Sequence, residues 1–94
     1  MISENKRSEI EIIYQILNAC QSGIKKTPLL HKTNLCFPHF INYISFLQKK
    51  GIISIHNNNS YDVFKITVKG EKILYNIRTL LNNMESYVLI IFSI

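Results

Sequence analysis

The sequence predicts an α+β fold that is mostly helical, with three helices, a two-stranded hairpin and a long last helix. Between Thr27 and Gly51, apolar residues recur at helical spacing on both sides of a proline-containing turn. From Ile52 to Thr67, short runs rich in β-branched and aromatic residues flank a polar turn. Beyond Thr67, the apolar residues return to helical spacing and keep it to the end of the chain. Each change of period marks a change of secondary structure.

The first helix is expected over about Ser3–Ser22, with Gly23 ending it. One face of this helix is apolar and is predicted to pack on the core: Ile10, Ile13, Leu17 and Cys20, widened by Ile16. Acidic residues near its start complement the positive end of the helix dipole: Glu4, Glu9 and Glu11. The basic segment Ile24–Lys26 then leads into the next helix.

A short helix, a turn and a longer helix are expected next. Thr27 is a favourable N-cap, and Pro28 suits the first helical turn because its missing N–H has no intrahelical partner there. Asn34 can adopt the left-handed conformation that ends such a helix. The longer helix is expected to begin at Pro38, because the residue before a proline favours extended geometry, and to stop at Gly51. Its predicted inward face is Phe40, Ile44 and Leu47.

The hairpin follows as a strand over Ile52–His56, a turn over Asn57–Ser60 and a second strand over Tyr61–Thr67. The three asparagines of the turn tolerate positive φ angles, and Phe64 and Ile66 share one face of the second strand. Two strands alone are marginally stable, so helices must cover them. Three helices followed by a hairpin form a winged helix-turn-helix, in which the hairpin, or wing, reaches over a DNA backbone or minor groove.

Thr67 is the expected cap of a last helix that starts near Val68. Its apolar residues are spaced alternately four and three apart, which is a heptad seam: Ile73, Ile77, Leu80, Met84, Tyr87, Ile91 and Ile94, with Leu74, Leu81 and Val88 as a second row. Ile73, Leu74 and Ile77 can pack on the same domain. Met84 lies about 15 Å beyond Leu74 along the helix, at 1.5 Å per residue, and is too far away to do so.

A second copy of the chain is therefore the expected cover, in a parallel or antiparallel pair, so that residues 1–68 form the DNA-binding domain and residues 69–94 a coiled-coil-like dimerisation helix. The predicted dimer interface is Ile73, Ile77, Leu80, Leu81, Met84, Tyr87, Val88 and Ile91.

Basic and acidic residues are segregated along the chain. The 94 residues carry a net charge of +5 and a pI near 9.4, which suits a polyanionic partner. Between Ile12 and Tyr61 there are five lysines and no acidic residue: Lys25, Lys26, Lys32, Lys49 and Lys50. A solvated lysine face is the alternative interpretation, but the segregation of these lysines onto the helix-turn-helix favours phosphate binding.

The sequence offers candidates for each kind of DNA contact. Opposite its inward face, the second helix of the motif presents Asn42, Ser45 and Lys49, with His39 at the flank, and asparagine can pair with adenine through two hydrogen bonds. Tyr43 is expected at the edge of the core, and Phe46 is expected to pack under the first or last helix. The full set of predicted DNA-binding residues is Lys25, Lys26, Thr27, Lys32, Pro38, His39, Asn42, Ser45, Lys49, Asn57, Asn58 and Asn59.

The sequence contains few of the features that other classes of function require. Cys20, His31, Cys36 and His39 are the residues that a zinc site would need, but they contain no close cysteine pair, so no metal and no cofactor is expected. The chain has no glycine-rich phosphate loop and no nucleophile beside a recognisable base, so no enzyme is expected. The apolar run Tyr87–Phe92 is far shorter than the roughly 20 residues that span a bilayer. A cytoplasmic, nucleoid-associated protein with reduced cysteines is expected, with no membrane partner and no small-molecule substrate.

Five segments together resemble the archaeal winged-helix family of predicted transcriptional regulators, which includes small chromatin-associated dimers with a C-terminal coiled-coil helix. They are Ile12–Leu17, Gly23–Thr27, His31–Leu35, Leu47–Ile53 and Phe64–Gly70. The resemblance implies double-stranded DNA binding, dimerisation through the last helix and no cofactor. Two features depart from the family: Cys36 replaces a usual hydroxyl residue, and Pro38 and His39 replace usual basic residues.

The predicted function is that of a double-stranded DNA-binding homodimer, either a transcriptional regulator or an architectural protein of chromatin. The alternative is a protein-interaction adaptor, in which the winged helix is a scaffold and the apolar last helix is the docking surface. Salt-sensitive retention on DNA distinguishes the first from the second.

Overall fold

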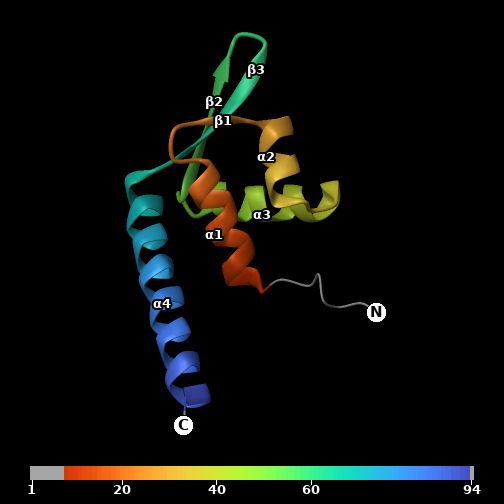
Figure 1. Ribbon diagram of the computed structural model, residues 1–94. Coiled ribbons are helices and arrows are strands. Elements are labelled where there is room, and N and C mark those ends of the chain that lie inside the picture. Colours follow the sequence, from red (N-terminus) through yellow and green to blue (C-terminus); the bar gives the residue numbers. More distant parts are fainter. Residues whose placement is uncertain (1–7, 94) are drawn as a thin grey trace.

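Four helices and three short strands make up the computed structural model (Figure 1), which describes the backbone of residues 8–93 and the side chains of residues 8–83. In chain order the elements are α1 Glu9–Ala19, β1 Ile24–Lys25, α2 Lys26–Thr33, α3 Phe37–Lys49, β2 Ile53–Asn58, β3 Tyr61–Ile66 and α4 Val68–Ser93.

Helix α1 begins at a capping box. The Ser8 hydroxyl accepts the Glu11 N–H at 3.2 Å, and the Ser8 N–H donates to a Glu11 carboxylate oxygen at 3.0 Å. The sequence predicts that Ser8 lies inside the helix, but Ser8 is the N-cap and the helix begins at Glu9. Residues 1–7, Glu4 among them, lie outside the described part of the chain. The predicted inward face is also rotated: Ile10 is 41% exposed, whereas Ile12 is buried because α1 packs between α2 and α4.

Helix α2 begins at Lys26, ahead of the predicted start at Pro28. Its N-cap is Lys25, whose side chain makes no capping hydrogen bond, so Thr27 is not the cap. The end is as predicted, because Asn34 adopts the left-handed conformation with φ 53° and ψ 37°. Strand β1 determines where α2 begins, because Lys25 is both the last residue of β1 and the N-cap of α2.

Helix α3 has the predicted inward face, with Phe40, Ile44 and Leu47 buried. It begins at Phe37 rather than Pro38, and Cys36 is its N-cap without a side-chain hydrogen bond. The helix ends at Lys49 with Lys50 as its C-cap, and Gly51, the predicted stop, follows with a φ of 73°, a conformation that glycine adopts without steric cost.

The hairpin is part of a three-stranded antiparallel sheet in the order β1-β3-β2, not the two-stranded sheet that the sequence predicts. Strand β1 pairs Ile24 with Phe64 and Lys25 with Val63. Two residues are too few to show an alternating pattern, which is why the sequence shows a linker there. Strands β2 and β3 pair from Ile53–Ile66 to Asn58–Tyr61, so the hairpin turns at Asn59, with φ 60°, and Ser60.

The core lies where α1, α3 and the inner face of the sheet meet, and the first turns of α4 close it. Leu74 of α4 is 3% exposed, and Phe64 and Ile66 of β3 are buried on the predicted face. The cap of α4 is Thr67, as predicted: its hydroxyl accepts the Gly70 N–H at 3.0 Å. The arrangement is a winged helix-turn-helix followed by a long helix.

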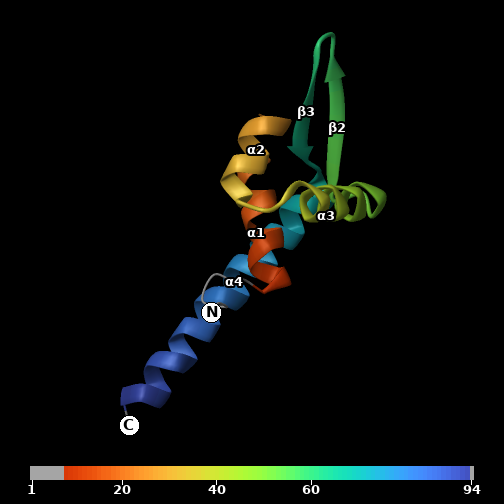
Figure 2. The ribbon, with the colours of Figure 1, turned by 90° about the vertical axis from the view of Figure 1, so that its right-hand side faces the viewer.

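Helix α4 and the wing point to opposite ends of the molecule (Figures 1 and 2). The upper part of α4 runs beside α1, where the Arg78 guanidinium donates to the Asn18 side-chain oxygen at 3.2 Å. The lower part projects past the start of α1. In the described part of the chain, no helix has the length and apolar character needed to cross a membrane.

Candidate nucleic-acid interface

The predicted DNA-binding residues are all at the surface. Each of the following side chains is exposed: Lys25, Lys26, Thr27, Lys32, Pro38, His39, Asn42, Ser45, Lys49, Asn57, Asn58 and Asn59. They come from the start and end of α2, the outer side of α3 and the tip of the wing. The structure does not gather them into one site; it distributes them over distinct surfaces.

One surface joins the start of α2 to the wing. Lys25, Lys26 and Thr27 line a groove of about 330 Å³ together with Pro28, and with Tyr61 and Asp62 of β3. The Lys25 ammonium lies 4.1 Å from the centre of the Tyr61 ring, a cation–π contact that holds the lysine over the strand. Sequence spacing does not indicate that Tyr61 lies here, because it is the pairing of β1 with β3 that brings it to α2.

This groove also contains an acidic residue. Asp62 lines it, and the Asn57 side-chain amide donates to a carboxylate oxygen of Asp62 at 3.0 Å. Lys25 of β1 and Lys26 of α2 therefore share the groove with one carboxylate, although no acidic residue lies near them in sequence.

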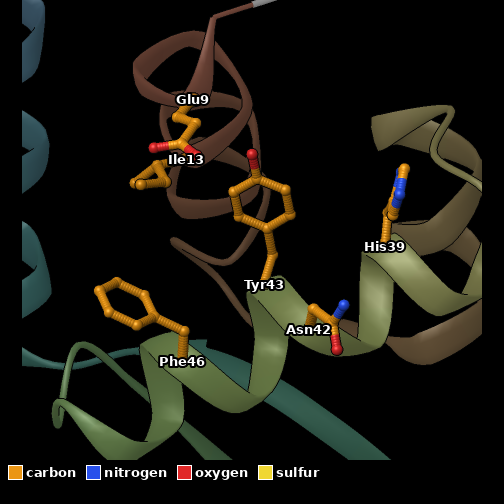
Figure 3. Close-up of a pocket in the computed structure, with 6 residues that line it drawn as sticks. All are labelled: Glu9, Ile13, His39, Asn42, Tyr43 and Phe46. Atoms are coloured by element: carbon orange, nitrogen blue, oxygen red, sulfur yellow. The ribbon is translucent and has the colours of Figure 1, made fainter.

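A second groove, of about 390 Å³, lies between α1 and α3. In Figure 3 the side chains of Tyr43 and Phe46 extend from α3 toward Glu9 and Ile13 of α1, and His39 and Asn42 line the groove farther along α3. The groove that His39 and Asn42 line therefore also contains the Glu9 carboxylate, and the Lys50 ammonium lies 5.9 Å from the ring of Phe46, which lines the same groove.

Phe46 departs from the prediction. Its ring is 49% exposed instead of packed under a neighbouring helix. It borders the groove opposite Ile13, and the Lys50 ammonium lies 5.9 Å from the ring centre, so the ring is covered only in part. Tyr43 is half-buried against the core, which confirms its predicted place at the core edge.

The opposite flank of α3 carries Phe37, which lies two positions before His39 and therefore roughly half a helical turn around the axis. The Lys26 ammonium lies 5.5 Å from the centre of the Phe37 ring, so this flank faces the start of α2. Sequence reasoning did not single out Phe37, because it placed the residue in the turn before the helix.

The amides of the wing tip are partly engaged within the hairpin. Asn57 bonds Asp62, and the Asn58 amide donates to the Tyr61 hydroxyl at 3.2 Å. Lys32 and Lys49 lie in the last turns of α2 and α3, where a cation also complements the negative end of the helix dipole.

The predicted dimer residues divide along α4. Ile73 and Ile77 are half-buried against the core of the same chain, Leu81 is half-buried and Leu80 is 43% exposed. The other four lie outside the described side chains: Met84, Tyr87, Val88 and Ile91.

The two cysteines have different surroundings. Cys20 is fully buried, and burial raises the pKa of its thiol to about 12, so it is an uncharged core residue at neutral pH. Cys36 is exposed at the start of α3. No group of three or more metal-ligating side chains is found among the residues whose positions the structure describes.

Comparison with known proteins identifies the family. The model of a family described as "Winged helix-turn-helix" matches residues 6–85. The chain belongs to this winged helix-turn-helix family. A similar sequence is "Uncharacterized protein MJ0287" of Methanocaldococcus jannaschii, which is 32% identical over 82 residues that cover 86% of this chain and 80% of the relative.

Solved winged helix-turn-helix structures have the same fold. One is Sso10a-2, described as a DNA-binding protein from Sulfolobus solfataricus, with a TM-score of 0.83, 22% identity and coverage of 93% of this chain and 92% of that chain. Another is a MepR mutant from S. aureus bound to an oligodeoxyribonucleotide, with a TM-score of 0.68, 14% identity and coverage of 85% of this chain and 60% of that chain. At these identities the likeness shows the fold.

Proposed function

We propose that the protein binds double-stranded DNA as a homodimer and acts as a transcriptional regulator or as an architectural protein of the nucleoid. The observation that carries the proposal is the exposed, lysine-bearing helix-turn-helix. Every lysine between Ile12 and Tyr61 is exposed, and neither α2 nor α3 contains an acidic residue. A surface of this kind attracts phosphates through counterion release.

The family and its solved members support the proposal. The chain has the winged helix-turn-helix fold, and similar structures include a protein described as DNA-binding and one bound to an oligodeoxyribonucleotide. In that fold the second helix of the motif enters the major groove. Helix α3 would then offer Ser45 and Asn42 to base edges, with Lys25, Lys26 and Lys49 on phosphates.

Helix α4 is the proposed dimerisation element. Leu80 is exposed on the predicted seam, and the apolar spacing of the sequence continues beyond it through Met84, Tyr87 and Ile91. A seam of this length needs a cover, and a second α4 supplies one of matching pattern. Residues 1–68 would form the DNA-binding domain and residues 69–94 the dimerisation helix.

Charge reversal tests DNA binding directly. Replacing Lys25, Lys26 and Lys49 with Glu should abolish the gel shift of a DNA duplex while the circular dichroism spectrum stays unchanged, because all three side chains are exposed. Lys72→Glu is the control, since Lys72 is exposed on α4 outside the helix-turn-helix. Undiminished binding by the triple variant would refute the assignment.

The adaptor remains the second candidate, and one observation favours it. Val68 and Tyr75 of α4 are 70% and 68% exposed, which leaves apolar surface outside the predicted seam. A stable complex with a different protein, together with no retention of the chain on DNA at low salt, would support the adaptor over the DNA-binding protein.

A further inference from the structure

We infer that Phe37 is a specificity-determining residue that contacts the C5-methyl group of thymine in the major groove. The inference rests on the proposed DNA-binding function and adds a base contact on a defined flank of α3.

The position of Phe37 is unusual for a phenylalanine. It is the first residue of α3, and 49% of its side chain is exposed. Its ring centre lies 6.4 Å from that of Phe40, which is fully buried, with the ring planes tilted by 31°. The Phe37 ring therefore lies against the core at the buried Phe40 ring and remains half exposed. An anchored ring loses little conformational entropy when a ligand covers it.

The surroundings of the ring favour a polyanion. The Lys26 ammonium lies 5.5 Å from the ring centre, and Lys25 and Thr27 follow along the adjoining groove, where the two lysines outnumber the one carboxylate, Asp62, which accepts a hydrogen bond from Asn57. The same flank of α3 continues through Ile41, Ser45 and Gln48, and it carries no acidic residue. The other flank, with His39 and Asn42, borders Glu9. A phosphate backbone is therefore accommodated on the Phe37 flank.

An apolar ring among cations matches one feature of the major groove. The groove displays hydrogen-bonding groups on every base pair, but the only methyl group there belongs to thymine, and phenylalanine is among the residues that contact it. Lys26 would hold the adjacent phosphate while the Phe37 ring covers the methyl group. Ser45, farther along the same flank, can bond a neighbouring base edge.

Two DNA duplexes of the same mixed sequence test this inference. One carries thymine, and the other carries uracil at every thymine position. The wild-type protein should bind the thymine duplex about fourfold more tightly for each methyl group buried. Phe37→Ala should bind both duplexes with equal affinity, because it has no ring to cover the methyl group. Equal wild-type affinities, or a preference that survives in Phe37→Ala, would overturn the inference.

Phe46→Ala is the matched control. Phe46 is also a phenylalanine of α3 and is also 49% exposed, but it lies on the flank that faces α1. This variant should keep the preference for thymine, and its loss there would contradict the assignment to Phe37. If the wild-type protein shows no salt-dependent binding to either duplex, the proposed function itself fails; binding without a thymine preference overturns the contact alone.

Discussion

Thr67 and Gly70 together join the last helix to the domain. The Thr67 hydroxyl accepts the Gly70 N–H at 3.0 Å and lies 2.7 Å from the Gly51 carbonyl oxygen, to which it donates. The Lys69 ammonium donates to the Lys50 carbonyl oxygen at 2.8 Å. One of the free N–H groups in the first turn of α4 and two carbonyl groups after α3 are thus paired at one junction.

Gly70→Ala is predicted to destabilise the protein. A Cβ at this position would overlap the Ile52 carbonyl oxygen and lie 2.7 Å from Cγ1 of Ile66. A backbone oxygen cannot rotate away, so α4 must shift, at a cost of about 1–3 kcal/mol in the free energy of unfolding. Helix propensity alone predicts the opposite, a gain of roughly 0.5–1 kcal/mol.

Urea unfolding measures the sign of this change. Lys72→Ala provides the reference for an alanine substitution at an exposed site of the same helix. A Gly70→Ala variant at least as stable as the wild type would show that α4 does not pack closely on Ile52.

The elements whose apolar residues recur at regular spacing were predictable from the sequence. The inward face of α3 follows from Phe40, Ile44 and Leu47, and the left-handed Asn34 and the cap Thr67 follow from residue type. Strand β1 was not predictable, since its two residues form a strand only through pairing with Phe64 and Val63. The start of α2 was missed for the same reason, because the strand places Lys25 at the N-cap.

The candidate site was predictable only as a set of exposed residues. Helical spacing correctly placed Asn42, Ser45 and Lys49 at the surface. It did not show that α1 brings Glu9 into the groove that Asn42 lines, or that β3 brings Asp62 into the groove that Lys25 lines. These neighbours depend on tertiary packing, which places the His39 flank of α3 beside α1 and the Phe37 flank beside the start of α2.

The proposed dimerisation role of α4 can be tested at one residue. Leu80→Glu should convert a dimer into a monomer in sedimentation velocity, because a carboxylate on the seam would be desolvated by the partner helix. Leu80 is 43% exposed in the single chain, so the substitution should not unfold the domain. Tyr75→Glu is the control, since Tyr75 is 68% exposed and lies well away from Leu80 around the helix. A wild-type monomer, or a Leu80→Glu dimer, would contradict the proposal.

For the whole molecule, the separation of charge matters more than the net charge of +5. Five exposed lysines lie on or directly beside the two helices of the helix-turn-helix, namely Lys25, Lys26, Lys32, Lys49 and Lys50, and the predicted apolar seam lies on α4, which points away from the wing (Figure 2). The proposed DNA-binding and dimerisation surfaces therefore lie on different elements.

The salt dependence of duplex affinity is the most direct test of the central claim, that the exposed lysines of the helix-turn-helix neutralise DNA phosphates. The logarithm of the binding constant of the wild type should fall linearly with the logarithm of the salt concentration. The slope should become shallower by about 0.9 for each phosphate that Lys25→Gln, Lys26→Gln or Lys49→Gln leaves without its lysine. Lys72→Gln should leave the slope unchanged. A wild-type slope near zero, or equal slopes in all five proteins, would contradict the account.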